Sequence, residues 1–365
     1  MVRFVEFIKR ETVFVISAIV AVITSFVVPV DAEYLDYIDY AVLIILFCLM
    51  ASVAGFKKYG GFDIFSARLL INEKRKKHIP AIMVLMCFFF SMVVTNDVAL
   101  ITFVPLTIYM IKDTSSLTLI YVVIMETLAA NLGSLITPIG NPQNLFLYHY
   151  YHLAIGEFMS TTLPLGAACL VIVVLLLFFV PSAEWEVPKD ISVKRIDRRK
   201  LVFFCVLFFV CILAVLKIIG YEWCLIIVAG CLIVWDRGIF AMVDYSLLFT
   251  FVNFFVIVGN LTRIESIEVL ISNFILGHEL LSGVLVSQCI SNVPAAIMLA
   301  PFTDNFKDLI LGVNIGGLGT LIASLASVIS FKYYSIARGA KKRKYIAVFT
   351  VMNVGVMLVL MWIFN

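Results

Sequence analysis

Residues 95–101 read TNDVALI, and residues 291–297 read SNVPAAI, so that Asn, Ala and Ile recur at a constant offset of 196 residues. A proline follows four residues after each Ile, at Pro105 and Pro301. Each copy is a polar interruption inside a long apolar run. Matching interruptions in the two halves of one chain indicate an internal duplication.

A second pair of segments follows in the same order. Residues 131–140 read NLGSLITPIG and residues 314–323 read NIGGLGTLIA, with five of ten positions identical at an offset of 183. Upstream, Asp39 and Asp244 each precede a tyrosine that opens a long apolar run, and both are predicted to be helix caps. Glycine-broken segments at matching places in two halves are typical of a transporter's binding site.

The composition excludes an ordinary soluble protein. Of 365 residues, 63% are hydrophobic and 14% are charged, with a mean hydropathy of +1.09. This leaves too little polar surface to cover a globule in water, so we expect an all-α polytopic membrane protein surrounded by a lipid bilayer. Nucleic-acid binding has no support, because the basic residues lie in short loops between apolar runs.

Nine apolar runs are candidate membrane spans: eight are near the length of about 20 residues that crosses about 30 Å of hydrocarbon, and one, 222–235, is shorter. They are residues 12–30, 38–55, 118–137, 161–181, 201–218, 222–235, 244–262, 309–331 and 345–364. Two further stretches, 80–111 and 280–304, have polar residues at their centres. Each half of such a stretch, at roughly 15 residues, reaches only about 22 Å. We therefore expect two re-entrant hairpins whose tips stop near the middle of the membrane.

The distribution of basic residues supports the hairpins. If both stretches enter and leave on one side, 24 of the 27 Lys and Arg residues fall on the side of the N-terminus. Only Lys217, Arg263 and Lys307 remain for the other side. A single crossing by residues 80–111 would move the cluster between 189 and 200 outside and destroy this bias. The positive-inside rule then predicts an integral protein of the plasma (inner) membrane, with a cytoplasmic N-terminus and an external C-terminus.

The same count predicts inverted repeats. The helix opened by Asp39 is the second span and the helix opened by Asp244 is the seventh, so the two run in opposite directions. We predict a first repeat over 1–182, with a hairpin at 80–111 and a broken helix at 118–150; a cytoplasmic linker over 183–200; and a second repeat over 201–365, with a hairpin at 280–304 and a broken helix at 309–331.

Broken helices leave backbone groups without partners, and in hydrocarbon only protein, ion or substrate can satisfy them. Carbonyl ends favour a cation, and hydroxyl, amide and carbonyl oxygens suit sodium. The predicted cation-binding residues are Thr95, Asn96, Asp97, Gly133 and Ser134 in the first half, and Ser291, Asn292, Gly316, Gly317 and Gly319 in the second.

Helix N-termini favour an anion, and the substrate is expected between the two tips. The predicted substrate-binding residues are Asn96, Thr137, Pro138, Asn141, Asn144, Asn292, Thr320 and Ser324. The predicted core contains no Lys or Arg to neutralise a small anionic solute. Helix dipoles and bound cations must do so instead, which predicts coupling to sodium or protons and no other cofactor.

Other interpretations of these residues stay open. Asn96 and Asn292 could be hydrogen-bonding contacts between helices, and the glycines could only permit close packing. Asp97 has Val293 at its matching position, so the two cation sites are not expected to be equivalent, and proton binding is the alternative to sodium ligation there. Glu126 is a second acid inside the membrane, an acid that faces a water-filled crevice, or a residue near the cytoplasmic end of its span.

The segments at 95–97, 140–144, 291–294 and 314–317 resemble the ion transporter superfamily, which includes divalent-anion/sodium symporters, citrate transporters, arsenite efflux permeases and sodium/proton antiporters. The resemblance implies that the Thr-Asn and Ser-Asn tips form cation sites that touch substrate. It also implies a homodimer in which a transport domain moves against a scaffold. Asp97 and Val293 stand where the resembled dicarboxylate symporters carry Thr, and Asp97 is more similar to the arsenite and antiporter branches.

These patterns predict a secondary active transporter that moves a small carboxylate or inorganic oxyanion, coupled to sodium or protons, by alternating access. The alternatives are an arsenite-type efflux permease or a sodium/proton antiporter, and then an ion channel, which also uses re-entrant segments. An intramembrane enzyme would need paired acids at one depth, and Asp97 with Glu126 is the only candidate pair. We therefore expect a protein that is not an enzyme.

Overall fold

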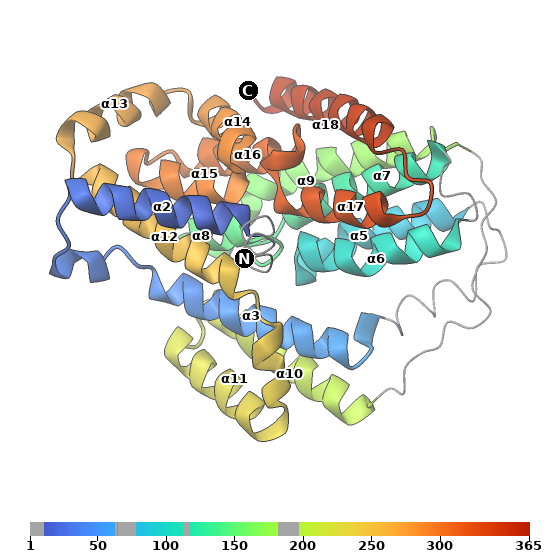
Figure 1. The fold of residues 1–365 in the computed structure, drawn as a ribbon, viewed down its shortest axis with the longest axis horizontal. Coiled ribbons are helices and arrows are strands. Elements are labelled where there is room, and N and C mark those ends of the chain that lie inside the picture. The colour runs from blue at the N-terminus through green and yellow to red at the C-terminus, as the bar shows by residue number, and fades with distance from the viewer. Residues whose placement is uncertain (1–10, 63, 65–77, 112–116, 182–196) are drawn as a thin grey trace, which may run out of the picture. The chain divides into compact units, whose positions relative to one another are not determined.

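The computed structural model describes residues 11–62, 64, 78–111, 117–181 and 197–365, and the elements of these residues are helices (Figure 1). Several basic residues of the predicted cytoplasmic side lie outside the described residues, as do positions 183–196 of the predicted linker. The basic residues are Arg3, Lys9, Arg10, Arg68, Lys74, Arg75, Lys76, Lys77, Lys112, Lys189, Lys194 and Arg195.

Backbone contacts divide the chain into two compact units, and each unit takes segments from both halves of the sequence. Unit 1 comprises Met1–Tyr59, Arg198–His278 and Ile297–Asp304. Unit 2 comprises Gly60–Asp197, Glu279–Ala296 and Asn305–Asn365. The compact units therefore do not follow the predicted boundary between repeats.

Unit 1 contains the helices at the start of each half. They are α2 (Thr12–Val27), η1 (Ala32–Leu35), α3 (Tyr40–Lys58), α10 (Arg198–Val215), α11 (Tyr221–Trp235), η3 (Arg237–Met242), α12 (Tyr245–Thr262), α13 (Glu265–Ile275) and η4 (Ala300–Phe302). The two predicted caps are confirmed: Asp39 accepts from the Val42 amide at 3.0 Å and Asp244 from the Leu247 amide at 3.1 Å. The amphipathic α13 has no counterpart among the sequence predictions.

Helices α2 and α12 lie side by side in unit 1 (Figure 1). Two amides of α12 hold the pair: Asn253 donates to Ser17 at 3.0 Å, and Asn260 donates to Thr24 at 3.1 Å. Both the donors and the acceptors are seven residues apart, which keeps them on one face of each helix. Between apolar helices, such bonds contribute about 0.6–2 kcal/mol each.

The C-terminal end of α3 packs against α10. A Cβ at Gly55 would lie 2.1 Å from the Phe204 ring, so only glycine permits this approach. Beyond the helix end, Asp236 accepts from Lys58 at 2.6 Å and from the Tyr59 hydroxyl at 2.5 Å. Partial burial of Asp236 opposes ionisation, but these hydrogen bonds outweigh it and hold its pKa below the ordinary value.

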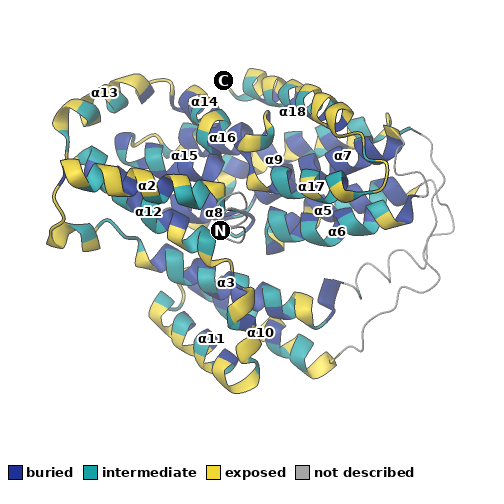
Figure 2. Cartoon of the chain, viewed as in Figure 1, coloured by how far each residue is buried: buried dark blue, intermediate teal, exposed yellow. Residues whose placement is uncertain are grey.

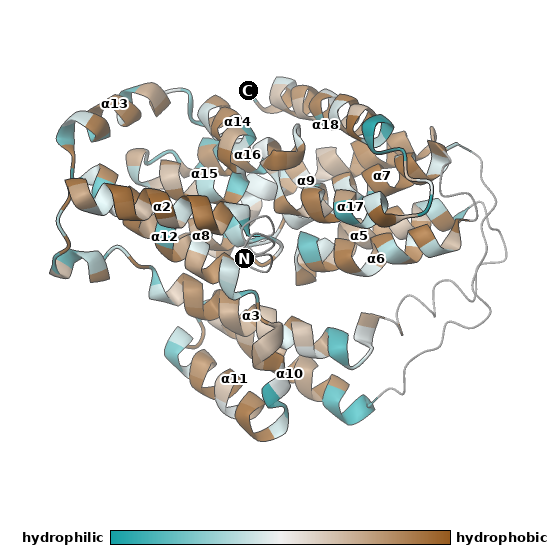
Figure 3. Cartoon of the chain, viewed as in Figure 1, coloured by the Kyte–Doolittle hydropathy of each residue, from teal (hydrophilic) through white to brown (hydrophobic). Residues whose placement is uncertain are grey.

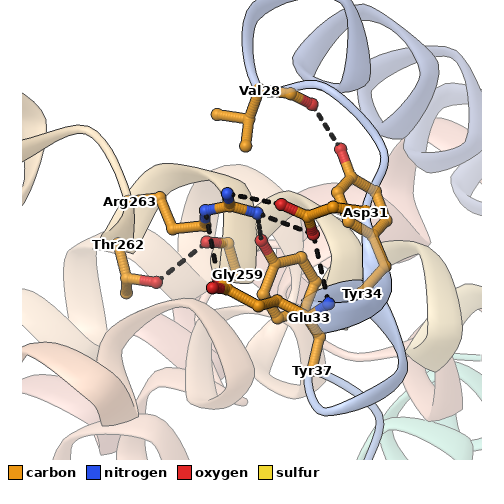
Figure 4. Close-up of polar contacts among 8 residues, drawn as sticks. All are labelled: Val28, Asp31, Glu33, Tyr34, Tyr37, Gly259, Thr262 and Arg263. Carbon is orange, nitrogen blue, oxygen red and sulfur yellow. Dashed lines mark hydrogen bonds and ion pairs between the residues drawn. The ribbon is translucent and has the colours of Figure 1, made fainter.

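A charged clamp holds the opposite end of unit 1, where α12 ends beside the segment between α2 and α3 (Figure 4). Arg263 binds Asp31 through two nitrogens, at 3.1 and 2.7 Å, and donates to the Tyr37 hydroxyl at 3.0 Å. A Cβ at Gly259 would lie 2.3 Å from the Tyr37 ring, which allows that ring to sit on α12. The hydrogen bonds from Arg263 hold the pKa of Asp31 below its ordinary value.

Unit 2 contains the first predicted hairpin, the second predicted hairpin as far as Ala296, and both predicted broken helices. Its elements are α5 (Ile79–Val94), α6 (Asn96–Met110), α7 (Leu117–Ser134), α8 (Pro142–Tyr150), α9 (Ile155–Leu177), α14 (Glu279–Ile290), the first residues of α15 (Asn292–Leu299), α16 (Phe306–Gly316), η5 (Leu321–Ala323), α17 (Leu325–Ile336) and α18 (Lys342–Phe364). The run at 309–331 is interrupted after Gly316, and the run at 118–137 ends at Ser134 and resumes as α8.

Helix α7 forms the centre of unit 2. From Thr118 to Ser134, Tyr121 is the only residue that is not fully buried. Figure 2 shows the contrast with α18, which carries exposed residues along its length. A helix buried on every face must satisfy its polar side chains within the protein, because neither water nor lipid headgroups reach it.

The exposed surface of several helices is apolar, as the hydrophobic colours over α2 and α18 show (Figure 3). Phe26 on α2 and Trp362 on α18 are each 85% exposed. Among the described residues, five segments are long and apolar enough to cross a membrane: Ala32–Lys58, Leu117–Ser134, Ile155–Leu177, Tyr245–Thr262 and Lys342–Phe364. Large exposed apolar side chains on long apolar helices require a hydrocarbon environment, so the protein is an integral membrane protein.

Candidate functional site

Each predicted hairpin breaks at a single residue in unit 2. Thr95 separates α5 from α6, and Ser291 separates α14 from α15. Both residues have positive φ, 91° at Thr95 and 78° at Ser291. Side chains with a Cβ rarely adopt this conformation, and residues held in it are concentrated at binding sites. The two tips, 196 positions apart, therefore share an unusual backbone.

The tips bind the glycine-broken segments at matching positions. The Asn96 amide donates to the Gly140 carbonyl at 3.2 Å, and the Ser291 hydroxyl donates to the Ala323 carbonyl at 3.3 Å. Gly140 and Ala323 are themselves 183 positions apart, the offset of the second sequence pattern. Each hairpin tip is therefore attached to the broken segment of its own half.

The glycines of the broken segments let the hairpins approach closely. A Cβ at Gly133 would lie 2.0 Å from the Phe88 carbonyl oxygen and 2.6 Å from the Ser91 hydroxyl oxygen. A Cβ at Gly316 would lie 2.7 Å from the hydroxyl oxygen of Ser287, the residue 196 positions after Ser91. Real Cβ atoms do not approach so closely, so both helix contacts require glycine.

Asn131 connects the first tip to the second broken segment. Its Oδ1 accepts from Asn96 at 3.0 Å and from the Ser324 hydroxyl at 3.2 Å, and its Nδ2 donates to the Ser327 hydroxyl at 3.3 Å. All four residues are buried. A single amide on α7 thus joins the α6 N-terminus to the N-terminus of α17.

Asn314 makes the corresponding connection in the other direction. Its Nδ2 donates to Oδ1 of Asn144 at 2.7 Å, and its Oδ1 accepts from Asn141 at 3.5 Å. Asn141 also donates to the Ser134 hydroxyl at 3.2 Å and caps α8 by accepting from the Asn144 amide at 3.1 Å. The predicted residues Asn141, Asn144 and Ser134 therefore lie in one network with Asn314.

The two connections are reciprocal. Asn131 and Asn314 are 183 positions apart, and so are Asn144 and Ser327. The same offset separates Asn141 from Ser324. Asn131 bonds Ser324 and Ser327 of the second half, and Asn314 bonds the residues at the matching positions of the first half, Asn141 and Asn144.

The remaining predicted residues lie around this network. Thr137 donates its hydroxyl to the Met92 carbonyl, and Pro138 is buried beside it. Asn292 is buried close to Gly317, where a Cβ would lie 2.6 Å from its Nδ2. Thr320 is exposed, so the structure does not bring its side chain into the buried network.

Two further predicted cation residues differ in their surroundings. Asp97 is partly buried in the first turn of α6, and its amide donates to Oδ1 of Asn96 at 2.9 Å. Gly319 has a φ of 99°, and a Cβ there would lie 2.4 Å from Oε1 of Gln288. Gly319 is therefore required for the turn after α16.

The buried polar side chains of unit 2 near the tips are neutral. Among the described residues, the fully buried polar and charged side chains include no Lys or Arg, and no group of three or more His, Cys, Asp or Glu residues could hold a metal ion. What the network offers is amide and hydroxyl oxygens together with the carbonyl ends of α7 and α16 and the amide ends of α6 and α15. Such groups suit a hard monovalent cation and an anion side by side.

The chain is similar to known proteins over most of its length. A family model described as a citrate transporter matches residues 3–308. The chain belongs to the citrate transporter family. Two relatives of this citrate transporter family member are each 30% identical to it. The uncharacterized transporter MJ0456 of Methanocaldococcus jannaschii matches over 323 residues, 87% of each chain, and the inner membrane protein YbiR of Escherichia coli K12 matches over 334 residues, 90% of this chain and 89% of that relative.

In this citrate transporter family member, three network residues were not predicted as binding residues: Asn131, Asn314 and Ser327. Asn131 and Asn314 open the two repeated segments and are identical at the offset of 183, so the signal that could have identified them was present. Ser327 carried no such signal, because its counterpart is Asn144. Only the approach of α17 to α7 places Ser327 at the network.

Gln288 is a further missed residue. Its amide donates to the carbonyls of Gly316 and Leu318, both at 2.8 Å, while its Oε1 accepts from the Thr320 amide at 2.9 Å. These bonds satisfy backbone groups that the break after α16 leaves without helical partners. The signal that could have identified Gln288 in the sequence is its polar side-chain amide within the apolar stretch 280–304.

Proposed function

We propose that this protein is a secondary active transporter that moves a small anion, a carboxylate or an inorganic oxyanion, by alternating access coupled to sodium or protons. The observation that carries the proposal is the reciprocal network of Asn131 and Asn314, which joins broken helices from both halves of the chain. Membership of the citrate transporter family makes citrate the first substrate to test.

The two halves are proposed to be inverted repeats. Reciprocal contacts, in which residue i binds j′ while i′ binds j, are what a two-fold axis produces. Asn131 with Ser327 and Asn314 with Asn144 have this form. The equal offsets at the tips and glycines support the same relation.

The proposed topology has nine spans and two re-entrant hairpins, with a cytoplasmic N-terminus and an external C-terminus. Its support is the bias of basic residues together with the breaks at Thr95 and Ser291, which divide each hairpin into two short helices. The plasma membrane is the proposed location, since the Escherichia coli relative is described as an inner membrane protein.

The cation sites are proposed at Thr95 to Asp97 with the carbonyl end of α7, and at Ser291 and Asn292 with the carbonyl end of α16. The anion is proposed to lie against the amide ends of α6 and α15, where helix dipoles favour negative charge. Because the buried network carries no basic residue, a bound cation raises anion affinity, and this linkage couples the two.

Unit 2 holds both hairpin tips, at Thr95 and Ser291, and we propose it as the moving transport domain, with unit 1 as the scaffold of a homodimer. The internal hydrogen bonds of unit 2 support movement as one body. Unit 1 has its own contacts between α2 and α12 and its own clamp at Arg263.

Reconstitution tests the proposal. Purified protein in proteoliposomes is given labelled citrate, succinate or sulfate, with a sodium gradient, a pH gradient or neither, and empty liposomes serve as the control. We expect saturable accumulation of at least one anion against its gradient, and exchange of labelled for unlabelled anion without any gradient. Flux that is insensitive to both gradients, or single-channel conductance in planar bilayers, contradicts coupled transport.

A sodium/proton antiporter or arsenite-type permease is the second candidate, because an acid, Asp97, stands beside the Asn96 tip. This candidate predicts sodium-driven proton movement without any carboxylate or sulfate, or arsenite flux. A pH-sensitive dye inside the same liposomes measures the first, and labelled arsenite measures the second.

A further inference from the structure

Glu126 lies on α7 and is 0% exposed. The helices packed against α7 are α5, α6, α9, α17 and α18, so the carboxyl group is enclosed on all sides by unit 2. It takes no part in the network of Asn131 and Asn314. The position 183 residues later is Leu309, an apolar residue, so the repeat offers no acid at the matching place.

One oxygen of the Glu126 carboxyl group accepts a hydrogen bond, and the other has no hydrogen-bond partner. The Thr107 hydroxyl of α6 donates to Oε1 of Glu126. Oε2 is buried without a hydrogen-bond partner. The Tyr345 hydroxyl of α18, one of the helices packed against α7, is also buried without a hydrogen-bond partner.

The groups that face Glu126 within the described core are neutral. The titratable side chains of the packed helices that are buried are Cys87 on α5, Cys169 on α9, Tyr334 on α17 and Tyr345 on α18. The other titratable and charged side chains of these helices are partly buried or exposed: Asp97 and Tyr109 on α6, Glu157 on α9, Lys332 and Tyr333 on α17, and Lys342, Arg343 and Lys344 on α18. Within the described residues, no ion pair joins a basic side chain to Glu126.

An ionised carboxylate in such a place is far more costly than a neutral acid, because neither solvent nor a cation offsets its charge. We propose that Glu126 is a proton-binding site of this transporter: the carboxyl group holds a proton in the conformation seen here and releases it when the transport cycle opens α7 to water. Its part in coupling rests on the proposed function, whereas proton occupancy does not.

The position of Glu126 on α7 explains how a proton could affect the substrate network. Thr127, the next residue, bonds Ser330 of α17 at 2.5 Å, and Asn131 bonds Ser327, one turn later on α7 and one turn earlier on α17. Glu126 is about 7.5 Å of helix rise from Asn131. Ionisation of Glu126 therefore disturbs the same α7–α17 contact that holds the network together.

Whether the Glu126 carboxyl group holds a proton is tested without any substrate. Infrared difference spectra of the purified protein in lipid nanodiscs are recorded during a pH titration, for the wild type, Glu126→Gln and, as a matched control, Glu268→Gln, which changes an exposed acid on α13. We expect the carbonyl band of a protonated carboxylic acid at neutral pH in the wild type and the control, and its loss in Glu126→Gln. A band that is absent from the wild type, or unchanged in Glu126→Gln, overturns the proposal.

The role in coupling is tested in proteoliposomes. Glu126→Gln is expected to lose proton-driven accumulation of the anion while retaining exchange of labelled for unlabelled anion, and Glu126→Asp is expected to restore the response to pH. Wild-type accumulation by Glu126→Gln under a pH gradient contradicts the coupling role.

If the wild type itself moves no anion, the proposed function fails, and the spectra still decide whether Glu126 binds a proton. If Glu126→Gln does not fold, the titration of the wild-type band against that of Glu126→Asp decides: a band that shifts with the substitution supports the site, and identical bands exclude it.

Discussion

Asn314 donates a 2.7 Å hydrogen bond to Asn144, and the residue 183 positions before Asn314 forms the counterpart of this bond with Ser327. Both bonds are buried in unit 2. The relation is not a consequence of helix geometry, because the bonded residues are 170 and 196 positions apart. It makes the two broken segments depend on each other.

Replacement of Asn131 or Asn314 by Ala is expected to reduce anion flux strongly and to lower the melting temperature by a few degrees. Each change leaves buried polar partners unsatisfied, at about 1–3 kcal/mol. Fluorescence-detected melting and proteoliposome flux measure the two effects. Asn253→Ala, which removes an amide contact between α2 and α12, is the control: it should lower stability and leave the apparent substrate affinity unchanged. Equal loss of substrate affinity in Asn253→Ala and Asn131→Ala would argue against a site-specific role.

Asn96→Ala and Asn292→Ala test the hairpin tips. Both residues are buried at the first turn of a helix that begins at a positive-φ residue. We expect each variant to be inserted and purified at normal levels and to lose transport. Flux equal to that of the wild type in either variant would mean that its tip asparagine only joins helices.

Gly133→Ala and Gly316→Ala test the close approach of the broken helices to the hairpins. A Cβ at either position would lie less than 3 Å from atoms of α5 or α14, and such overpacking is expected to cost about 1–3 kcal/mol. Gly230→Ala on α11 is the matched control, since a Cβ there meets nothing within 4 Å. It should be neutral or stabilising by up to about 1 kcal/mol. Melting temperatures that fall equally in all three variants would refute the steric explanation.

The clamp of Arg263 on Asp31 predicts a pH dependence of unit 1. Because the hydrogen bonds of Arg263 lower the pKa of Asp31, the folded state binds that proton less readily than the unfolded state. The stabilising contribution is complete above the ordinary Asp pKa of about 3.9 and is lost as the pH falls through the lowered value. Melting of the wild type and Asp31→Asn should therefore differ at pH 7 and converge in strong acid. High salt should shrink the difference at pH 7, since the pair is exposed.

The local patterns of the chain were sufficient for the class of fold and for the breaks. Apolar runs predicted the long helices, and the polar residues at 95–97 and 291–292 predicted where two hairpins break, because chain breaks depend on residue types within a few positions. The caps Asp39 and Asp244 were predicted for the same reason. The start of α9 at Ile155, six residues before the apolar run, was missed because its first turn is held by Glu157 and not by hydrophobicity.

Other properties depend on contacts between residues far apart in the chain. That Ser327 belongs to the network follows from the packing of α17 on α7, and that Gln288 bonds the backbone after α16 follows from the packing of α14 on α16. The exposure of Thr320, which separates it from the predicted site, has the same origin. Residue type alone does not specify the direction in which a polar side chain points.

The amino-acid sequence by itself determined that this protein lies in a membrane and that it contains two matched pairs of broken segments, because both conclusions follow from composition and from spacing along the chain. Only the tertiary structure decided that Asn131 and Asn314 reach across to the opposite half, and that Glu126 is enclosed with no ion pair to a basic side chain of the described residues. Burial and hydrogen-bond partners are set by which helices pack together, and that packing joins residues whose separation along the chain carries no local signal.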